Sequence, residues 1–244
     1  MKTRREILSL SAVAALGLAA PGSAALAKPQ SQTSSTGDTP RWGMVIDLRK
    51  CIGCQACTVS CSMENAVPVG NHRTVVSTYE IQTDDGPGQA VLPRLCNHCE
   101  NPPCIPVCPV EATFQQKDGT VVIDAEQCVG CGYCVQACPY DARFINKQTG
   151  VADKCTFCVQ RVGVGLLPAC VETCVGGARV FGDLRAEDSA VTKLIRNHKV
   201  DVLRPHMGTR PQVYYIGLDD RLQDRVEAES GSRQLRNQDA QQES

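Results

Sequence analysis

The chain has 244 residues, enough for one large domain or two small ones, and its 25 Lys and Arg residues nearly balance its 26 Asp and Glu residues. This balance gives neither the basic excess typical of nucleic-acid binding nor a block of like charge typical of an interaction tail. Aromatic residues make up only 4% of the chain and cysteines number 16, so disulfides or an inorganic group must replace part of an apolar core.

The N-terminal segment has the features of an export signal in the expected order. Arg4 and Arg5 precede an apolar run at 7–20 that is too short to span a bilayer, and an A-x-A cleavage site ends at Ala27. We therefore expect a twin-arginine signal peptide at 1–27 and a linker at 28–40; a short amphipathic helix with two chance arginines is the alternative. No later stretch is long and apolar enough to predict a membrane span.

Short strands and one helix are predicted between and after the cysteines. Runs of strand-forming residues predict strands at 43–48, 74–81, 180–184 and 212–218. Turn residues at 117–120 and 147–149 predict two hairpins, with strands at 112–116 and 121–124 and at 142–146 and 150–153. Residues 86–88 are predicted to form a loop, 188–198 a helix, and 229–244 a disordered tail.

The cysteines form four groups with a common spacing. Every group begins with C-x2-C and ends with C-x3-C, and only the gap between the two pairs differs. In chain order the groups are Cys51, Cys54, Cys57 and Cys61; Cys96, Cys99, Cys104 and Cys108; Cys128, Cys131, Cys134 and Cys138; and Cys155, Cys158, Cys170 and Cys174. The repeat indicates one type of site made four times.

The spacing within a group suits a cubane iron–sulfur cluster. Residues three apart in a tight turn aim their sulfurs into one pocket, and the fourth cysteine is expected near the start of a helix. In two-cluster ferredoxins this fourth cysteine precedes a proline and ligates the other cluster. Pro109 and Pro139 match that pattern in groups two and three, whereas Ser62 and Val175 replace the proline in groups one and four. Spacing alone leaves open whether groups one and four are paired.

Three other interpretations of the cysteines compete with this one. Zinc ribbons use two C-x2-C pairs, and groups two and four, with two separated pairs of cysteines, could be misread that way; in groups one and three, three cysteines at x2 spacing would crowd one side of a small ion. Disulfides suit an exported chain, but the short loops pair poorly, and the twin-arginine route resembles one used for proteins folded with cofactors before export. Buried structural thiols do not explain sixteen cysteines in register. Clusters of the [4Fe–4S] type are therefore expected.

Glycines inside the cysteine loops have two interpretations. Gly53, Gly130 and Gly132 are either turn residues or positions where backbone N–H groups approach inorganic sulfide. No phosphate loop, dinucleotide fingerprint or nucleophile motif accompanies them. No catalytic residue is therefore predicted.

Two further polar motifs are interpreted without a chemical role. His98 lies between two cysteines of group two and is expected to face solvent, with tuning of a reduction potential or contact with a partner as the alternative. Asp219 and Asp220 are expected at a helix N-terminus, not in a metal site.

Five stretches within 42–184 resemble a known family. They are IDLRKCIGCQACTVSC, RLCNHCENPPCIPVCPVEATFQ, CVGCGYCVQACPYDARFIN, ADKCTFC and LLPACVETCVGGARVFGDL. These motifs are similar to the iron–sulfur subunit of molybdopterin oxidoreductases of the dimethyl-sulfoxide-reductase type. The missing prolines and the long gap in group four are departures from the strict ferredoxin pattern.

The resemblance implies four ligand sets, in which three cysteines of one group are completed by the last cysteine of another. Numbered by the group that gives three ligands, the first set is Cys51, Cys54, Cys57 and Cys174, and the second is Cys96, Cys99, Cys104 and Cys138. The third set is Cys128, Cys131, Cys134 and Cys108, and the fourth is Cys155, Cys158, Cys170 and Cys61.

The expected fold is α+β, with two bacterial-ferredoxin-like [4Fe–4S] modules, one inserted in the other, built from short strands and helices. Groups one and four are assigned to a module at 41–88 and 142–185, and groups two and three to an insertion at 89–141. A C-terminal extension at 186–228 and the tail at 229–244 follow.

The resemblance implies a non-catalytic electron-transfer subunit with four [4Fe–4S] clusters. Its expected partners are a multi-span membrane subunit that oxidises quinol and a molybdopterin catalytic subunit; no nucleic acid is expected. Its expected location is the periplasmic side of the cytoplasmic membrane, reached by the twin-arginine route. Within this resemblance, the export signal and the motifs NHCENPPC and PQVYYIGLD imply tetrathionate as the acceptor in anaerobic respiration, with polysulfide, thiosulfate, nitrite and dimethyl sulfoxide as alternatives. A self-contained reductase acting at an exposed cluster is a further alternative.

Overall fold

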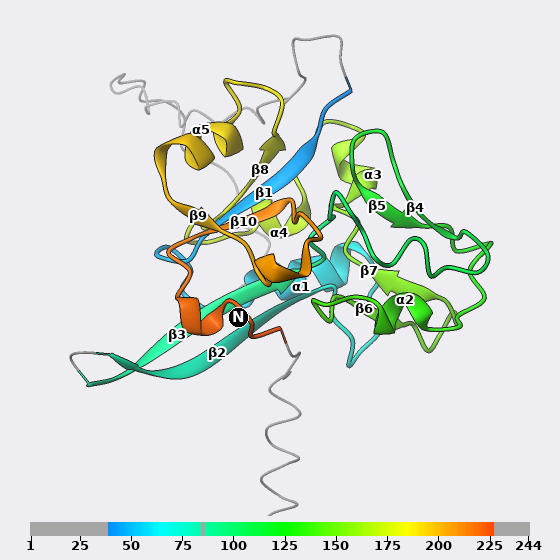
Figure 1. The fold of residues 1–244 in the computed structure, drawn as a ribbon, viewed down its shortest axis with the longest axis horizontal. Helices are drawn as coiled ribbons and strands as arrows, with labels where there is room; N and C mark the ends of the chain where they lie inside the picture. Colours follow the sequence, from blue (N-terminus) through cyan, green and yellow to red (C-terminus); the bar gives the residue numbers. More distant parts are fainter. Residues whose placement is uncertain (1–38, 84–85, 227–244) are drawn as a thin grey trace, which may run out of the picture. The chain divides into compact units, whose positions relative to one another are not determined.

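The computed structural model describes residues 39–83 and 86–226. The predicted signal peptide, nearly all of the linker and the predicted disordered tail lie outside these residues. Within them the chain forms one four-stranded sheet, three two-stranded hairpins and several short helices (Figure 1).

The four-stranded sheet has the order β8-β1-β10-β9. Strand β1 (Trp42–Asp47) pairs antiparallel with β8 (Arg179–Asp183) and parallel with β10 (Val213–Ile216), which pairs in turn with β9 (Val200–Asp201). Because β1 lies inside the sheet, its side chains alternate between two buried faces. Met44 and Ile46 belong to one core, and Val45 belongs to another core beside helix α5 (Ala190–Asn197). The predicted strands and helix in these regions are confirmed, with ends shifted by one or two residues.

A long hairpin is formed by β2 (Thr74–Thr83) and β3 (Gly86–Leu95). The prediction of a loop at 86–88 is wrong, because Pro87 pairs with Gln82 and Gly88 with Ile81. Each strand of a two-stranded hairpin has one open edge, where backbone N–H groups do not pair with another strand. A proline, which has no N–H, is therefore tolerated where it faces that edge. Gly-Pro-Gly is a turn signal in the sequence, but strand pairing overrides it here.

Two smaller hairpins follow the second and third cysteine groups. One consists of β4 (Thr113–Gln115) and β5 (Val121–Ile123), and the other of β6 (Arg143–Ile145) and β7 (Ala152–Lys154). Both confirm the hairpins that the turn residues predicted. Gly119 and Gly150 have positive φ angles in the two turns.

Short helices carry part of each cysteine group except the second. Helix α1 (Ala56–Glu64) contains Cys57 and Cys61, α2 (Tyr133–Gln136) contains Cys134, and α4 (Ala169–Glu172) contains Cys170. Helix α3 (Val159–Val162) begins directly after Cys158. The prediction that the fourth cysteine lies near the start of a helix is wrong: it lies late in α1 or after the end of α2 and α4. The third cysteine lies near the helix start instead.

The 3₁₀ helices η1 (Pro205–Met207) and η2 (Asp220–Leu222) lie near the C-terminal end of the described chain. Asp219 caps η2, since its carboxylate accepts a hydrogen bond from the Arg221 N–H. The helix N-terminus predicted at Asp219 and Asp220 is therefore confirmed.

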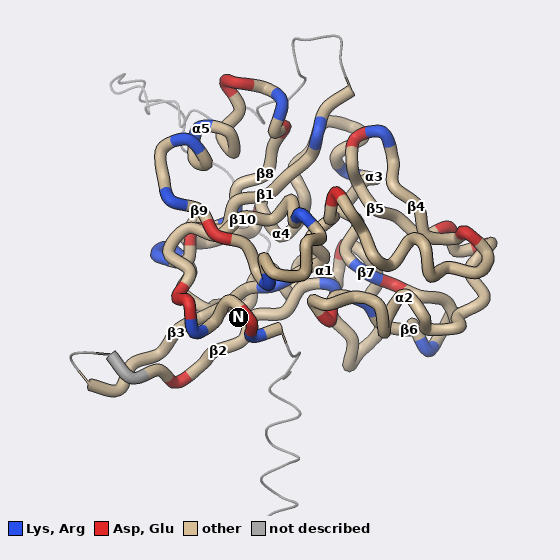
Figure 2. Tube along the Cα trace, viewed as in Figure 1, with Lys and Arg blue, Asp and Glu red and all other residues tan. Residues whose placement is uncertain are grey.

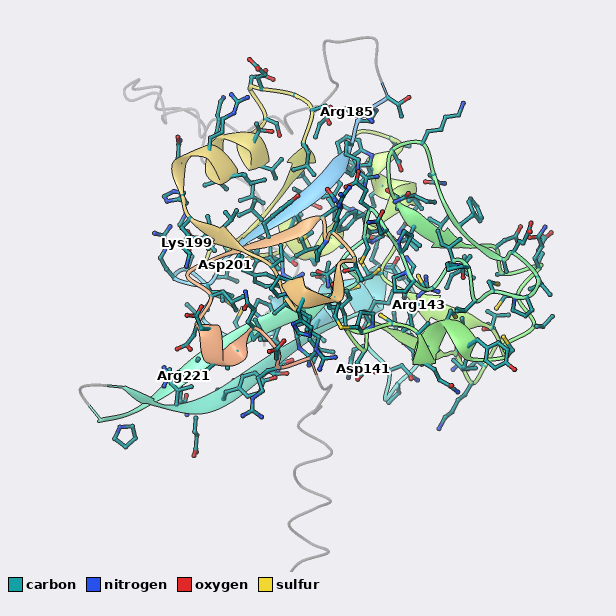
Figure 3. The ribbon with its side chains drawn as sticks, in the orientation of Figure 1. Asp141, Arg143, Arg185, Lys199, Asp201 and Arg221 are labelled. Carbon is teal, nitrogen blue, oxygen red and sulfur yellow. The ribbon has the colours of Figure 1, made fainter. Side chains whose placement is uncertain are left out.

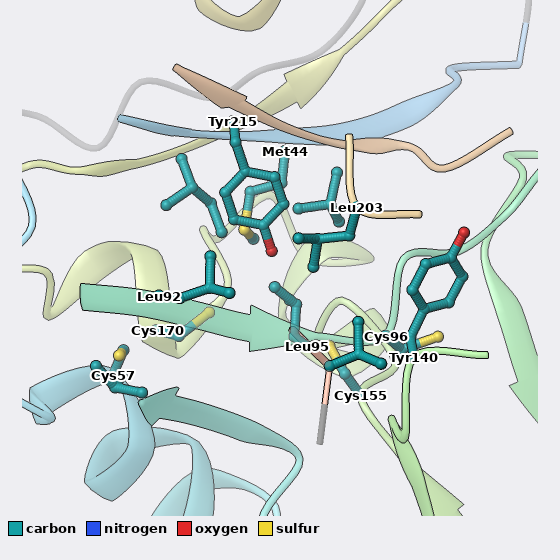
Figure 4. Close-up of a cluster of buried hydrophobic side chains, with 14 of the residues drawn as sticks. Met44, Cys57, Leu92, Leu95, Cys96, Tyr140, Cys155, Cys170, Leu203 and Tyr215 are labelled. Carbon is teal, nitrogen blue, oxygen red and sulfur yellow. The ribbon is translucent and has the colours of Figure 1, made fainter. Parts of the chain in front are cut away.

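The largest core lies between the sheet and the long hairpin, and it includes cysteines. Figure 4 shows Tyr215 and Met44 from the sheet above Leu92 and Leu95 from β3, with cysteine sulfurs around them. A separate small core contains Cys104, Val121, Cys134 and Ala152.

The β6–β7 hairpin packs on this second core through Ala152 and Ile145. The predicted module boundary between residues 141 and 142 falls directly before this hairpin. Its packing partners therefore come from the segment predicted to be the insertion.

Basic and acidic residues are interspersed along the described chain (Figure 2). Among residues 39–83 and 86–226, no helix has both the length and the apolar character needed to cross a membrane.

Candidate functional site

Group one is placed by the turn between β1 and α1. Cys51 and Cys54 lie in the turn, and Gly53 has a φ of 70°, so it is one of the residues that need glycine's freedom there. Cys57 and Cys61 lie four residues apart on α1 and therefore on the same side of the helix. Both are buried.

The first set surrounds one cavity. Cys51, Cys54 and Cys57 line it together with Cys174, which comes from the end of group four. Arg179 lines the same cavity. Burial raises the pKa of Cys51, and the nearby thiolates of Cys57 and Cys174 raise it further.

The fourth set surrounds a second cavity. Cys155, Cys158 and Cys170 line it with Cys61 from α1. The side-chain amide of Asn65 donates to the Sγ atoms of Cys61 at 3.6 Å and Cys158 at 3.9 Å, and so bridges two groups that are far apart in the sequence. Burial raises the pKa of Cys61 to about 12, with smaller contributions from Cys170 and Cys158.

The cysteines of the second set lie close enough to one another to interact electrostatically. Burial raises the pKa of Cys99 to about 12, and Cys96, Cys138 and Cys104 add to the shift. Burial likewise raises the pKa of Cys104, to about 11. Cys138, from the end of group three, interacts electrostatically with all three group-two cysteines of this set.

The third set is as open as the first: Cys134 is buried, and Cys108 and Cys128 are partly exposed. Cys128 and Cys134 contact the second core, and Cys131 is exposed. Cys108 is surrounded by backbone donors: burial raises its pKa, but N–H groups of Thr113, Val110 and Ala112 outweigh this and hold it below the usual value.

The sets adjoin one another in a definite order. The first and fourth sets meet at Arg179, which lines the cavity of Cys57 and donates a hydrogen bond at 2.8 Å to Thr74 in the lining of the cavity of Cys170. Cys96 of the second set is among the thiolates that raise the pKa of buried Cys155, which belongs to the fourth set. The second and third sets meet at Arg143, whose pKa responds to thiolates of both. The order is therefore first, fourth, second, third.

Exposure of the cysteines follows this order. Cys54 and Cys131 are the two exposed cysteines, and they belong to the first and third sets, at the two ends. Every cysteine of the fourth set is buried. A partner protein that gives or takes electrons would therefore have the most direct access to the first and third sets.

The chemistry of the sites fits sulfur-ligated iron. All sixteen cysteines are free thiols, and several Sγ atoms already accept hydrogen bonds, from the N–H of Ala152 to Cys128 and of Phe157 to Cys155, both at 3.4 Å. Buried polar atoms without a protein partner lie beside cysteines, among them Arg179 Nη1 and the side-chain amide of Asn97. Donors aimed at sulfide or thiolate are typical of iron–sulfur sites. Among the described residues, no three His, Cys, Asp or Glu side chains converge on a single metal ion.

His98 does not face solvent, so that prediction is wrong. Its side chain is fully buried, its ring stacks on Phe157 with centroids 3.7 Å apart, and its Nδ1 accepts a hydrogen bond from the Val121 N–H at 3.1 Å. Burial holds the pKa of His98 well below its usual value, and the nearby Lys154 and Arg143 cations add to this. The loop between two cysteines turns this ring inward, toward the second and fourth sets.

Beside the cysteine sets lie three buried basic residues that are not predicted from the sequence: Arg143, Lys154 and Arg179. Arg143 is labelled in Figure 3. Its Nη2 lies 2.9 Å from Cys104 Sγ. The sequence does contain a pattern that could have identified the two arginines. Arg143 and Arg179 each lie five residues after the last cysteine of a group, at the start of a short strand. Lys154 directly precedes Cys155.

Family models and curated relatives support the same type of site. A 4Fe-4S dicluster domain model matches residues 88–184, and a 4Fe-4S binding domain model matches 42–63. A tetrathionate reductase subunit of Salmonella typhimurium is 59% identical over 184 residues, which cover 74% of each chain. The corresponding tetrathionate reductase subunit of Archaeoglobus fulgidus is 46% identical over 73% of this chain and 83% of the relative. A putative dimethyl sulfoxide reductase iron-sulfur subunit of Halobacterium salinarum is 42% identical over 72% of this chain and 78% of the relative.

Proposed function

The chain belongs to the family of iron–sulfur electron-transfer subunits of molybdopterin reductases such as tetrathionate reductase, and from this we propose that it holds four [4Fe–4S] clusters in a relay. The relay takes electrons from a quinol-oxidising membrane subunit and passes them to a molybdopterin catalytic subunit. When bound, such clusters supply one-electron transfer. The chain itself supplies the ligands, the spacing and the electrostatic surroundings.

The observation that carries this proposal is the continuous order of the four cysteine sets. Successive sets share buried neighbours, and the exposed Cys54 and Cys131 belong to the two terminal sets. A relay between two partners needs such an arrangement, because it needs one accessible site at each end and protected sites between them. A single buried site or four isolated sites would not serve this purpose.

Iron and acid-labile sulfide in anaerobically purified protein test the number of clusters. We expect about sixteen iron atoms per chain and a brown colour that bleaches with dithionite. A content near four irons per chain would sink the four-cluster proposal. A colourless protein containing zinc would favour a structural metal site instead.

Tetrathionate is the proposed acceptor of the complex, on the strength of the identity to the Salmonella typhimurium relative. Polysulfide, thiosulfate, nitrite and dimethyl sulfoxide are the alternative acceptors of related complexes. The isolated chain is expected to accept electrons from an artificial donor without reducing tetrathionate, whereas the complex isolated with its catalytic partner reduces it. Turnover of tetrathionate by the isolated chain would show that it is itself a reductase.

Export by the twin-arginine route to the periplasmic side of the membrane is the remaining part of the proposal. Arg4 and Arg5, with the apolar run that follows, support it. A chain with both arginines replaced by lysine is expected to stay in the cytoplasm with its clusters loaded. Fractionation of cells that finds this variant exported as well as the unaltered chain would contradict the route.

A further inference from the structure

Three basic side chains are buried in the interior next to the cysteine sets. Arg143 is 4% exposed, Arg179 is 3% exposed and Lys154 is 1% exposed. Burying a cation is costly unless negative charge lies close to it. Each of the three therefore needs a nearby anion, which the neighbouring cysteines supply when they ligate iron as thiolates.

Arg179 lies where the first and fourth sets meet. It lines the cavity of the first set, and its Nη2 donates to Thr74 Oγ1 at 2.8 Å, which lines the cavity of the fourth set. Burial alone would lower the pKa of Arg179, but the thiolates of Cys170 and Cys57, one from each set, raise it. Its other terminal nitrogen, Nη1, has no protein partner although it is buried.

Lys154 lies where the fourth and second sets meet. Its Nζ donates to the carbonyl oxygen of Cys155 at 2.7 Å and to that of Val121. Burial lowers the pKa of Lys154, and the thiolates of Cys96 and Cys155, from the second and fourth sets, oppose that shift. The ammonium group thus stands between the two middle sets.

Arg143 lies where the second and third sets meet. Its Nη2 is 2.9 Å from Cys104 Sγ of the second set, and its Nη1 donates to Thr113 Oγ1 at 3.3 Å. Burial would lower the pKa of Arg143, but Cys104, Cys96 and Cys134 raise it, and Cys134 belongs to the third set. Each junction of the relay therefore contains one buried cation.

We propose that Arg179, Lys154 and Arg143 are counter-charges, one at each junction, and that each raises the reduction potentials of the two clusters beside it. The inference rests on the proposed relay of four clusters. A cluster with four thiolate ligands is an anion, and reduction adds a further negative charge. A fixed positive charge between two such sites favours reduction of both, and it weakens the repulsion between them when both hold an electron.

Replacement of Lys154 by methionine tests this most sharply, since methionine keeps an unbranched side chain and removes the charge. Redox titration of anaerobically purified protein, followed by electron paramagnetic resonance, gives the potential of each cluster. Signals are first assigned with Cys138→Ser for the second set and Cys61→Ser for the fourth. In Lys154→Met we expect the equilibrium constants for reduction of these two clusters to fall together about tenfold, or about 59 mV for one electron. The first- and third-set clusters should change by clearly less.

The other junctions give the same test with a different pair of clusters. Arg179→Met should lower the potentials of the first and fourth clusters, and Arg143→Met those of the second and third. Lys154→Arg keeps the charge and should restore the potentials of the middle pair. Lys147→Met is the matched control, because Lys147 lies in the turn of the same hairpin and is exposed.

The outcomes separate this inference from the relay itself. Unaltered protein with far fewer than sixteen irons refutes the proposed function. Fully loaded protein in which Lys154→Met shifts all four potentials equally, or none, refutes the counter-charge assignment and leaves the relay standing. If Lys154→Met does not load its clusters, Lys154→Gln and the two arginine variants replace it in the test. The criterion stays the same: the reduction potentials of the two clusters at the altered junction must fall together.

Discussion

Gly130 and Gly132 stand two residues apart in the third cysteine group, yet their surroundings constrain them differently. Both have positive φ angles, 67° and 80°, where a side chain costs about 1 kcal/mol. A Cβ on Gly132 would meet nothing within 4 Å, whereas a Cβ on Gly130 would lie 2.0 Å from the Gly150 carbonyl oxygen. Turn geometry therefore accounts for both glycines, and Gly130 additionally allows the loop to touch the β6–β7 hairpin.

Alanine at these two glycines should separate the two effects. Gly132→Ala is expected to cost about 1 kcal/mol, from backbone strain alone. Gly130→Ala should cost clearly more, since the hairpin turn must move away from the cysteine loop. Rates of cluster bleaching in denaturant measure the difference, and equal rates for the two variants would contradict it.

A substitution at Cys61 tests whether the fourth cysteine of a group ligates the cluster of another set. Cys61 lies on α1 beside Cys57 but lines the cavity of Cys155, Cys158 and Cys170. Cys61→Ser should therefore perturb the fourth-set cluster, and Cys57→Ser, one helical turn away, the first-set cluster. Paramagnetic resonance of the reduced variants distinguishes them. Loss of only the first-set signal in Cys61→Ser would rule out the crossing.

At the residue scale, the sequence was most informative about cysteines and least about buried polar groups. The four spacings identify the ligand loops, because a loop of a few residues determines where its own thiols point. His98 and Lys154 could not be placed in this way, since their burial depends on Phe157 and Val121, which are distant in sequence. Arg143 and Arg179 do share a sequence pattern, because each lies five residues after the last cysteine of a group.

At the element scale, the strands were predictable wherever composition and turn residues agreed. Strand β1 illustrates this, since its apolar run at 42–46 matches a strand buried on both faces. The β3 segment at 86–88 was not predictable, because its Gly-Pro-Gly sequence is a turn signal and only the partner strand β2 keeps it extended. The order of the strands in the sheet could not be predicted from the sequence either, since β1 pairs with segments far along the chain.

Val45 offers a test of the sheet that leaves the cysteines alone. It is fully buried in the core beside α5, together with Val191 and Ile216. Val45→Ala should lower the free energy of unfolding by about 2 kcal/mol, from lost burial and a small cavity. Iron content should not change.

Val164→Ala is the matched control for this experiment. Val164 is 73% exposed, so its truncation should change the free energy of unfolding by less than about 0.5 kcal/mol. Equal effects at the two valines would show that β1 does not have the central place that its pairing assigns to it.

At the scale of the whole molecule, the order of the sets makes the ends of the relay its vulnerable points. Cys54 in the first set and Cys131 in the third are exposed, while the fourth set between them is enclosed. Reagents that attack iron–sulfur sites meet exposed thiolates first. The protection of the middle sites is thus a property of the fold rather than of any one residue.

Limited oxidation with ferricyanide should reveal this order. Clusters of the first and third sets should be lost before those of the second and fourth, because only the former have exposed ligands. Paramagnetic resonance after increasing oxidation measures the loss of each signal. Early loss of the fourth-set signal would contradict the order derived from the neighbouring thiolates.

The pairing of β1 with β10 also determines when, during synthesis, the four-stranded sheet can be completed. Met44 pairs with Val213, so a ribosome releases β1 long before its partner strand exists. The small hairpins β4–β5 and β6–β7 need only neighbouring residues and can close as soon as they emerge. Strand β1 can therefore pair with β10 only late in synthesis, whereas the cavity of the first cysteine group needs the chain only as far as Arg179. Until Cys174 has been synthesised, the thiols of Cys51, Cys54 and Cys57 lack the partner that completes their set.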